Sequence, residues 1–321
     1  MMSLTIPHSF ALAVSAVALG AFVGGLAGQG QAREAIDFEA QRSTVFPQVV
    51  ADVRRSATGR IAFSAGPHPH EDVYLVNADG SGLRRLTDDP DADFDPSWSP
   101  DGRRIAYRHE GGDGDSTAEI YVMNANGSQK RNLTRRRGQD HSPAWSPDGR
   151  RIAFASVRGG PMPSIWVMNA DGSRQMRVSR VSGEYPAWSP DGRKLAFDRN
   201  TFGPTGWDIW VMNTDGSHLR PLIASRADEQ GAAWSPDGKT IAYGSSRGAP
   251  SNYARIWLAN ANGSGQHLLT RQVGERPAWS KRGTHLLFTG GRIFVVRLDG
   301  SGLTSIPVQL PGEAALADWT R

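Results

Sequence analysis

The stretch Trp98-Ser99-Pro100-Asp101-Gly102 decides the fold of this chain. The same five residues recur in full at three later tryptophans, which are Trp145, Trp188 and Trp234. An altered copy follows as Trp279-Ser280-Lys281-Arg282-Gly283, and a last tryptophan, Trp319, stands near the C-terminus. Successive tryptophans lie 40 to 47 residues apart. A fixed period of this length is typical of folds that repeat one supersecondary unit.

Each repeat carries the signals of four short strands. In the repeat that contains Trp98, residues 96–98 end a first strand and Ser99–Gly102 form a turn. Proline presets φ, aspartate can bond its own backbone, and glycine accepts positive φ, so these residue types favour a turn. Residues 104–107 and 120–123 alternate as second and third strands, Asn126-Gly127 is a hairpin turn, and residues 132–134 form an outer strand.

The two ends of the repeat region predict how the structure closes. Residues 61–63, 73–76 and 83–87 supply strands two, three and four with no first strand before them. Residues 317–319 supply a first strand with nothing after it. Joining the two pieces removes an open sheet edge, which would invite aggregation. The sequence therefore predicts an all-β, six-bladed β-propeller over residues 59–321, closed by pairing of the C-terminal strand with the first blade.

The tryptophans fit this architecture as packing residues. One tryptophan per blade is expected to lie between neighbouring sheets, where each buries roughly 200 Å². At ~25 cal/mol per Å² this burial contributes up to about 5 kcal/mol before entropy is subtracted. Trp166, Trp210 and Trp257 recur in the third strand and are expected to pack within blades. Trp207 alone fits no repeat position.

The N-terminus has a different character. Residues 10–27 are apolar or small, and Gly30-Gln31-Ala32 places small residues at the −3 and −1 positions of a cleavage site. We expect residues 1–32 to be a secretory signal peptide or an N-terminal anchor, and residues 33–58 to be a lead-in segment. Either alternative places the propeller in the periplasm or outside the cell. Any membrane contact is expected only through an uncleaved N-terminal segment.

Composition excludes several classes of function. The chain has no cysteine, so it has no disulfide framework, thiolate metal site or cysteine nucleophile. The formal net charge is +4. The arginines recur at strand starts, where we expect them to pair with acids on a solvated rim, so we predict no nucleic-acid partner.

The motif [PA]-x-W-S-P-D-G, followed by I-A-F/Y and then I-Y/W-V-M-N-x-D-G, resembles the repeat of TolB-type β-propellers. The resemblance covers roughly residues 59–321. In that family, TolB is periplasmic, its propeller binds the peptidoglycan-associated lipoprotein, and a separate N-terminal α/β domain contacts the rest of the Tol system. Residues 33–59 are too few for such a domain. The resemblance therefore implies a lone TolB-like propeller, with a lipoprotein of this kind as a candidate partner.

The two faces of the predicted propeller differ. One face carries nearly identical turns, whereas the other carries the loops between strands two and three and the links between blades, which vary. Variable loops on one face are where a repeat protein usually binds. Aromatic residues in these loops are binding candidates: Phe202, Trp207 and Tyr253. We therefore expect a monomeric protein-binding platform of the cell envelope.

Acidic residues in the blade links suggest a second binding feature. Each lies four to six residues before its tryptophan: Asp93, Asp140, Glu184, Glu229, Glu275 and Glu313. If these acids cluster at one mouth of the propeller's central channel, their combined negative potential would attract a cationic segment or an ion. The alternative is that these acids cap turns and pair with nearby arginines.

Three histidines raise an alternative function. His70, His109 and His141 fall on the variable face in adjacent blades, where imidazoles could hold a divalent cation. The competing interpretation is that they are solvated loop residues. Gly244–Gly248 matches G-x-S-x-G, but no helix is expected after it, so the motif does not predict a nucleophile. We predict no catalytic residues and no required cofactor. The alternative to a binding platform is an exported hydrolase or lyase that acts on a glycan or peptide with a histidine-bound metal.

Overall fold

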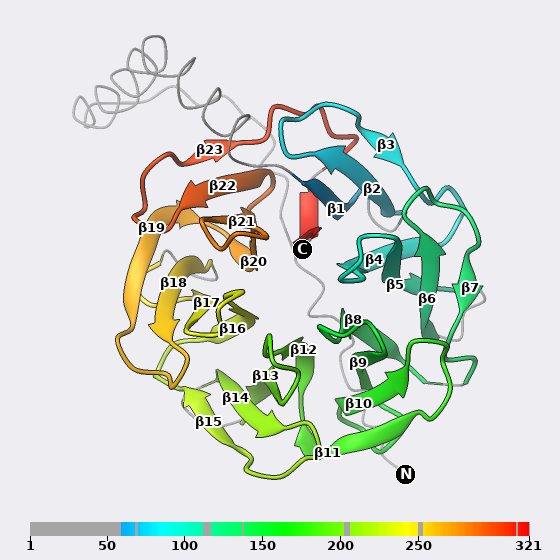
Figure 1. The fold of residues 1–321 in the computed structure, drawn as a ribbon, viewed down its shortest axis with the longest axis horizontal. Coiled ribbons are helices and arrows are strands. Elements are labelled where there is room, and N and C mark those ends of the chain that lie inside the picture. Colours follow the sequence, from blue (N-terminus) through cyan, green and yellow to red (C-terminus); the bar gives the residue numbers. More distant parts are fainter. Residues whose placement is uncertain are drawn as a thin grey trace, which may run out of the picture. The chain divides into compact units, whose positions relative to one another are not determined.

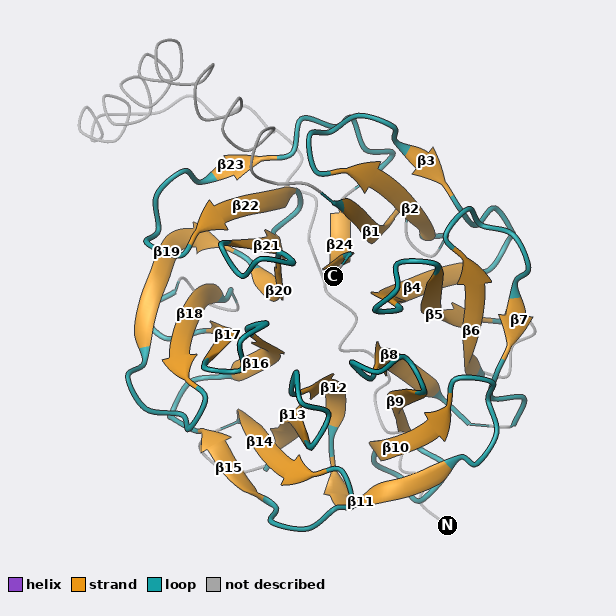
Figure 2. Ribbon diagram, viewed as in Figure 1, coloured by secondary structure: helices purple, strands orange, loops and turns teal. Residues whose placement is uncertain are grey.

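The fold is known from a computed structural model of the chain. It describes residues 59–320 except 68–69, 112–116, 137, 202–205, 250–252 and 313. Within these residues, six four-stranded antiparallel sheets stand around a central axis, and none of the described residues is helical (Figures 1 and 2). We call the sheets blades A to F in chain order. The predicted all-β six-bladed propeller is confirmed.

Each blade runs from an inner strand at the axis to an outer strand at the rim. Blade A contains β24 (Ala314–Trp319), β1 (Arg60–Ala65), β2 (Asp72–Asn77) and β3 (Arg84–Arg85). Blade B contains β4 (Ala92–Trp98), β5 (Arg104–Glu110), β6 (Ala118–Asn124) and β7 (Arg131–Asn132). Blade C contains β8 (Asp140–Trp145), β9 (Arg151–Ser156), β10 (Ser164–Asn169) and β11 (Met176–Ser182).

The remaining three blades repeat this order. Blade D contains β12 (Glu184–Trp188), β13 (Lys194–Asn200), β14 (Trp207–Asn213) and β15 (Arg220–Ile223). Blade E contains β16 (Glu229–Trp234), β17 (Thr240–Ser245), β18 (Arg255–Asn260) and β19 (His267–Val273). Blade F contains β20 (Glu275–Trp279), β21 (His285–Thr289), β22 (Ile293–Arg297) and β23 (Thr304–Ser305).

The ring closes as the sequence predicts. Strand β24 pairs antiparallel with β1, and Trp319 lies opposite Ile61. Figure 1 shows the C-terminal strand, in red, beside the first strands, in blue. Strand β24 comes from the end of the chain and β1 from the start of the described part. Their pairing completes blade A with four strands, as in every other blade, and leaves no open edge on β1.

The core is divided among the spaces between blades. Six hydrophobic clusters each join the residues of one blade to those of the next, and each contains one of the repeat tryptophans. Trp98, for example, packs on Val73 and Leu75 of blade A. Trp188 is 1% exposed, and its indole Nε1 donates to the Ala144 carbonyl of blade C at 3.0 Å. The predicted packing of tryptophans between sheets is confirmed.

Some strand-start arginines contact indoles, a role that the repeat pattern did not predict for them. Arg60, Arg104 and Arg151 each place the guanidinium over the tryptophan of the following blade. The distances from Cζ to the ring centroid are 4.6–4.8 Å. A guanidinium over an indole face is a favourable cation–π arrangement, so these arginines help to hold adjacent blades together.

The turns after each tryptophan are built from local hydrogen bonds. In the first copy, the Ser99 hydroxyl donates to Asp101 at 2.6 Å, and Ser99 Oγ accepts from the Arg104 backbone N–H at 2.9 Å. The same Ser–Asp bond recurs in the three other intact copies at 2.6 Å. Gly102 has a φ of 65°, which a glycine accepts without strain. These bonds explain why the turn sequence repeats.

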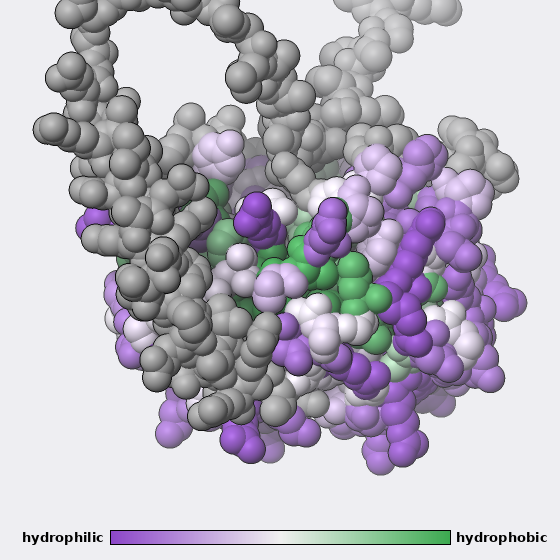
Figure 3. Space-filling model, turned by 90° about the horizontal axis from the view of Figure 1, so that it is seen from above, coloured by the Kyte–Doolittle hydropathy of each residue, from purple (hydrophilic) through white to green (hydrophobic). Residues whose placement is uncertain are grey.

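Figure 3 shows one side of the molecule, where hydrophilic residues border a hydrophobic area. Among the described residues, five large hydrophobic side chains are exposed: Leu83, Met162, Met176, Tyr253 and Leu303.

No described helix is long and apolar enough to cross a membrane. The predicted signal or anchor segment, 1–32, and the lead-in, 33–58, lie outside the described residues.

Candidate binding site at the channel mouth

The inner strands contain an irregularity that the repeat pattern did not reveal. In blades B to F, the residue three positions before the tryptophan has a positive φ, between 50° and 68°. These residues are Asp95, Ser142, Tyr185, Gly231 and Arg276. The pairing register of each inner strand shifts at this point, which marks a β-bulge. We call these five residues the bulge residues.

The bulge residues line a central cavity of about 180 Å³. Tryptophans of the inner strands and prolines of the turns that follow them line much of the rest, among them Trp98, Trp145, Pro100 and Pro147. The bulges lie near the ends of the inner strands that follow the blade links, on the face of the variable loops. The cavity is therefore polar at the bulge residues, an end that we call the channel mouth, and it has a more apolar wall toward the turns that follow the tryptophans.

Arg276 is the central residue of this mouth. It belongs to β20 in blade F, but its guanidinium lies over the Tyr185 ring of blade D, with 3.1 Å from Cζ to the ring centroid. Its Nη1 is also 3.7 Å from Asp198 Oδ2, again in blade D. The side chain thus passes blade E, where Gly231 has no Cβ. A Cβ built on Gly231 would lie 3.2 Å from Arg276 Cδ, so glycine provides the space.

Asp198 supports this arrangement from β13. Its side chain is 1% exposed, and its two carboxylate oxygens accept from the Gly231 backbone N–H at 2.9 and 3.0 Å. Burial raises the pKa of Asp198 to about 7, although Arg276 and the backbone donors act in the opposite direction. Asp198 therefore links blades D, E and F and titrates near neutral pH.

The opposite side of the mouth has a second set of contacts between blades. Asp95 Oδ2 accepts from the Ser142 backbone N–H at 3.0 Å, which links blades B and C. Burial lowers the pKa of His141 to about 4, and Arg108 adds to this effect, so the imidazole is neutral at pH 7. Burial raises the pKa of Glu184, while Arg276 opposes the shift. The mouth is a mixed cluster of acids, arginines and neutral polar groups.

The predicted binding acids occupy two different places. Asp93, Asp140 and Glu229 lie five residues before their tryptophans and are fully buried within their own blades. Asp140 pairs with Arg158, and Glu229 pairs with Arg247 at 2.7 Å. Asp93 pairs instead with His109, at 2.8 Å between Oδ1 and Nδ1. The structure places these three acids in ion pairs and hydrogen bonds inside the blades.

Glu184 and Glu275 lie four residues before their tryptophans and are partly exposed. The charge of Glu184 acts on Asp198, and that of Glu275 acts on Arg276, which places both acids beside the mouth. Glu313 lies outside the described residues. Of the six predicted acids, these two therefore adjoin the channel cluster.

Two of the three predicted aromatic residues, Trp207 and Tyr253, lie on the rim of blades D and E. Trp207 begins β14 and is half-buried, and its backbone N–H donates to Asp228 at 3.0 Å. Tyr253 precedes β18 and is 56% exposed. Phe202 lies outside the described residues. Trp207 and Tyr253 thus both adjoin connections between second and third strands, on the variable face.

The three candidate metal histidines have separate environments. His70 is exposed, and its Nδ1 lies 3.0 Å from the Pro90 carbonyl oxygen. His141 lies at the channel mouth, 3.0 Å from the Ser142 hydroxyl. His109 lies among acids instead, grouped with Asp89 and Asp93. Among the described residues, the group that could hold a metal ion therefore contains one of the three predicted histidines, His109, together with Asp89 and Asp93.

The G-x-S-x-G match has a structural role in the connection after β17. Ser246 Oγ accepts from the Asp228 backbone N–H at 2.9 Å. The described residues that follow lead into strand β18 and not into a helix. Ser246 therefore holds the blade link in place, and its described surroundings lack the geometry of a nucleophile elbow.

Sequence reasoning missed the central residues of the mouth, Arg276, Tyr185 and Asp198. One signal was available: the position three residues before each tryptophan differs in every blade, while the position after it is always proline or alanine. A position that varies inside an otherwise constant repeat is a candidate for function. The bulge that directs these side chains to the axis has no comparable signature in the sequence.

A protein-family model described as the TolB beta propeller domain matches residues 112–185 and 182–306, which is more than half of the chain. No curated protein sequence matches the chain. Among solved structures, TolB from Acinetobacter baumannii superposes with a TM-score of 0.70 at 22% identity, over 82% of this chain and 66% of that one. The chain thus spans about two thirds of the length of that TolB.

Two further structures show how widely the fold is used. A protein assigned as TolB from Agrobacterium tumefaciens matches with a TM-score of 0.65 at 19% identity, over 80% of this chain and 91% of that one. An oligogalacturonate lyase in complex with manganese matches with a TM-score of 0.51 at 13% identity, over 78% and 74%. At these identities the likeness concerns the fold alone, which occurs in enzymes as well as in TolB.

Proposed function

Since this chain belongs to the family described as the TolB beta propeller domain, we propose that it is an exported, monomeric propeller that binds a protein partner in the cell envelope. The partner docks on the variable face, between the channel mouth and the aromatic rim of blades D and E. A peptidoglycan-associated lipoprotein is the first candidate, because the TolB-type resemblance implies that partner.

The observation that carries this proposal is the set of bulge residues. Four of the five are not glycine and still adopt a left-handed backbone conformation. Such residues cost of order 1 kcal/mol or more and are concentrated at functional sites. The bulge itself needs no side chain at this position, since Gly231 adopts the same backbone conformation in blade E. The side chains that converge on the channel mouth are therefore best explained by binding.

The chemistry of the mouth suits a polypeptide segment. Arg276, whose side chain is 16% exposed, offers a guanidinium, and Glu184 and Glu275 offer carboxylates beside it. A partner that presents one acidic group and one donor would complement both signs of charge, while Tyr253 and Trp207 supply aromatic contact area. Tyrosine, tryptophan and arginine are the residue types that dominate binding energy in protein interfaces.

A photo-crosslinking residue at position 253 tests the docking face in cells. Position 176 is the matched control, because Met176 is 62% exposed and Tyr253 is 56% exposed, but Met176 lies on an outer strand. We expect one envelope protein to crosslink at 253 and not at 176, and Glu184→Lys to abolish the product. Equal products at both positions, or none at either, would rule out this face.

Affinity for the captured partner then tests individual residues. With purified proteins, we expect Trp207→Ala and Arg276→Ala each to weaken binding at least tenfold, which corresponds to about 1.4 kcal/mol. Met176→Ala is the control and should leave the dissociation constant unchanged. Unchanged affinity in both Trp207→Ala and Arg276→Ala would show that the partner binds elsewhere.

The export component of the proposal rests on the apolar segment at residues 10–27. Cell fractionation, together with the intact mass of the recovered protein, tests it. We expect the protein in the periplasm or medium with a new N-terminus after Ala32, or membrane-bound with the segment retained. Recovery of the full-length protein from the cytoplasm would contradict export and leave the docking experiment to be judged on purified components.

A further inference from the structure

Blade B differs from its neighbours at one equivalent position. Asp93, Asp140 and Glu229 all lie five residues before a tryptophan and are all fully buried. In blades C and E an arginine provides a permanent positive charge to the acid, through Arg158 and Arg247. In blade B the partner is His109, which lies directly opposite Asp93 in the β4–β5 pair. His109 occupies the strand position that Ser156 and Ser245 occupy in blades C and E, where the arginine follows two residues later. The buried acid of blade B thus has a histidine as its partner, whereas the other two acids have an arginine.

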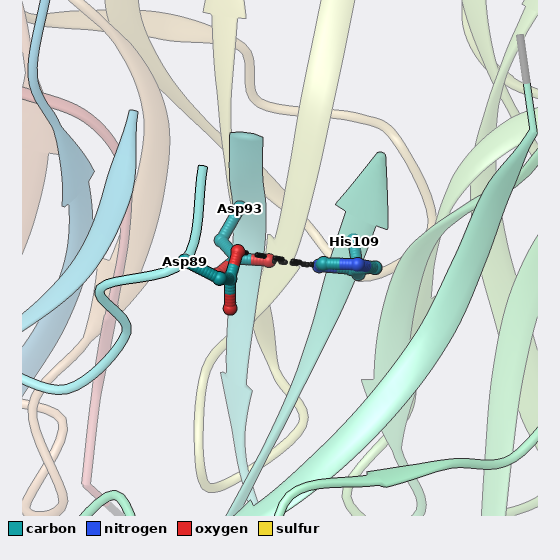
Figure 4. Close-up of side chains that lie close together, drawn as sticks. All are labelled: Asp89, Asp93 and His109. Atoms are coloured by element: carbon teal, nitrogen blue, oxygen red, sulfur yellow. Dashed lines mark hydrogen bonds and ion pairs between the residues drawn. The ribbon is translucent and has the colours of Figure 1, made fainter. Parts of the chain in front are cut away.

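Further carboxylates surround the same histidine. The link between β3 and β4 reads Asp88-Asp89-Pro90-Asp91, so it brings several acids to one end of blade B. Asp89 Oδ1 lies 3.9 Å from His109 Nδ1, and Asp91 Oδ2 lies 3.6 Å from His109 Nε2. The ligand atoms of Asp89, Asp93 and His109 all lie within 4.8 Å of one another (Figure 4).

Two carboxylate oxygens in this cluster have no hydrogen-bond donor among the described residues. These atoms are Asp93 Oδ2, on a side chain that is 0% exposed, and Asp89 Oδ1. The Thr87 hydroxyl lies within hydrogen-bonding reach of Asp93 as well, but its single proton is donated to Asp72 at 3.2 Å. A buried carboxylate oxygen without a donor is destabilising unless another positive group satisfies it. Glu229 Oε2 likewise lacks a donor within the described part of the chain, but Arg247 already occupies the surroundings of that acid.

We propose that Asp89, Asp93 and His109 form a binding site for a divalent transition-metal ion, for which Zn²⁺ is the best-fitting candidate. Two carboxylates and one neutral imidazole carry a charge of −2, which a divalent cation neutralises. The ion supplies the positive charge that a guanidinium supplies to the buried acid in blades C and E. It also satisfies the two carboxylate oxygens that lack a donor.

The ligand types select among metals. Zn²⁺ accepts imidazole nitrogen and carboxylate oxygen at about 2.0–2.2 Å in a tetrahedral arrangement, whose ligands are then about 3.4 Å apart. The cluster needs only small side-chain rotations to reach this spacing. Ca²⁺ requires six to eight oxygen ligands, and Mg²⁺ prefers an octahedron of oxygens, so both fit a histidine-containing set of three less well.

The site is reachable from solvent. Asp89 and Asp91 retain 32% and 26% exposure of their side chains, whereas Asp93 is fully buried. An ion can therefore enter past Asp89, and Asp91 or water can complete the coordination. Because the site lies on the variable face of blade B, a bound ion would fix the link between blades A and B on that face.

Isothermal titration of the untagged full-length chain with Zn²⁺ tests the site. Asp89→Asn is the main variant, because Asp89 is partly exposed and its change leaves the buried Asp93–His109 pair in place. We expect one Zn²⁺ per wild-type chain and at least a tenfold loss of affinity in Asp89→Asn and in His109→Gln, as changes at metal sites typically produce. Mg²⁺ and Ca²⁺ should not displace the bound ion.

Two neighbouring residues provide matched controls. His70→Gln removes an exposed histidine that lies between β1 and β2 and contacts the Pro90 carbonyl of the link, and Asp88→Asn removes an acid whose side chain is 81% exposed. Neither change should alter Zn²⁺ affinity. The proposal is overturned if the wild type binds no Zn²⁺, or if Asp89→Asn binds as tightly as the wild type. It also fails if anomalous density from a Zn²⁺-soaked crystal lies away from His109.

Discussion

The two ends of the inner strands use the same kinds of residues in opposite ways. At the turn end, the polar side chains bond within their own turn, as the Ser99 hydroxyl does with Asp101. At the channel end, they bond between blades, as Asp95 does with Ser142 and Asp198 does with Gly231. The turn end is nearly identical from blade to blade, whereas the channel end differs in every blade.

This difference separates folding from the binding that we propose for the channel end. Local hydrogen bonds form in each repeat independently, so the same sequence suits every copy. Contacts between blades depend on which two side chains meet, so each blade contributes its own residue. Variants in the packing between blades, at the channel end and at the turn end should therefore differ in their effects on stability.

The largest effect is expected from the packing that both ends share. Trp188→Ala removes an indole that is 1% exposed between blades C and D, so we expect a loss of about 3–5 kcal/mol in the free energy of unfolding. Trp207→Ala removes a half-buried tryptophan of the variable face and should cost less than about 1.5 kcal/mol. Chemical denaturation of both variants checks this, and equal losses would mean that Trp207 is also structural.

The second prediction concerns the pH dependence of the channel end. The pKa of Asp198 is raised to about 7 in the folded state, above its ordinary value of 3.8. The folded protein therefore binds this proton more tightly, and the resulting stability is complete below about pH 4 and is lost as the pH rises to 7. The stability of the wild type relative to Asp198→Asn should fall across this window, by an amount on the order of a few kcal/mol.

Urea denaturation at several pH values measures the Asp198 effect. Asp191→Asn is the control from the turn end, because the Ser189 hydroxyl lowers the pKa of Asp191. Its contribution should have the opposite sign: it is present above pH 4 and is lost as the pH falls below that value. A stability difference between wild type and Asp198→Asn that does not change from pH 4 to 7 would show that Asp198 is ionised throughout.

A double-mutant cycle tests whether bonds at the channel end couple blades. Asp95 Oδ2 lies 3.3 Å from Ser142 Oγ as well as 3.0 Å from its backbone N. We expect Asp95→Ala and Ser142→Ala to interact by about 0.5–2 kcal/mol. Asp101→Ala and Asp148→Ala, in separate turns, should add to within about 0.5 kcal/mol. Additivity at both ends would show that the channel-end residues of blades B and C are as independent of each other as residues in separate turns.

The smallest effect is a gain at the degenerate fifth turn. There Arg282 replaces aspartate, and Ser280 Oγ accepts from the His285 backbone N–H at 3.0 Å as in the intact turns. Arg282→Asp should restore the missing serine–aspartate bond and stabilise the protein by roughly 0.5–1 kcal/mol. Thermal denaturation measures the change. A destabilised variant would show that the local pattern does not transfer between copies.

The placement of the acids follows a spacing that is already present in the sequence. Asp93, Asp140 and Glu229 stand five residues before a tryptophan, whereas Glu184 and Glu275 stand four residues before one. Successive side chains of a strand point to opposite faces, so a shift of one residue separates buried acids from acids near the channel. Alignment of the repeats on tryptophan is therefore enough to divide the acids into these two groups.

The number of blades, the order of strands in each, the closure by the last strand and the packing of tryptophans between sheets could all be predicted from the amino-acid sequence. These features follow from local turn chemistry and from strand alternation, both of which recur in every repeat. The contact of Arg276 with Tyr185 past Gly231, and the grouping of Asp89 with Asp93 and His109, became visible in the folded structure. Those contacts depend on a bulge and on segments from different strands and blades, and no local pattern specifies which side chains meet there.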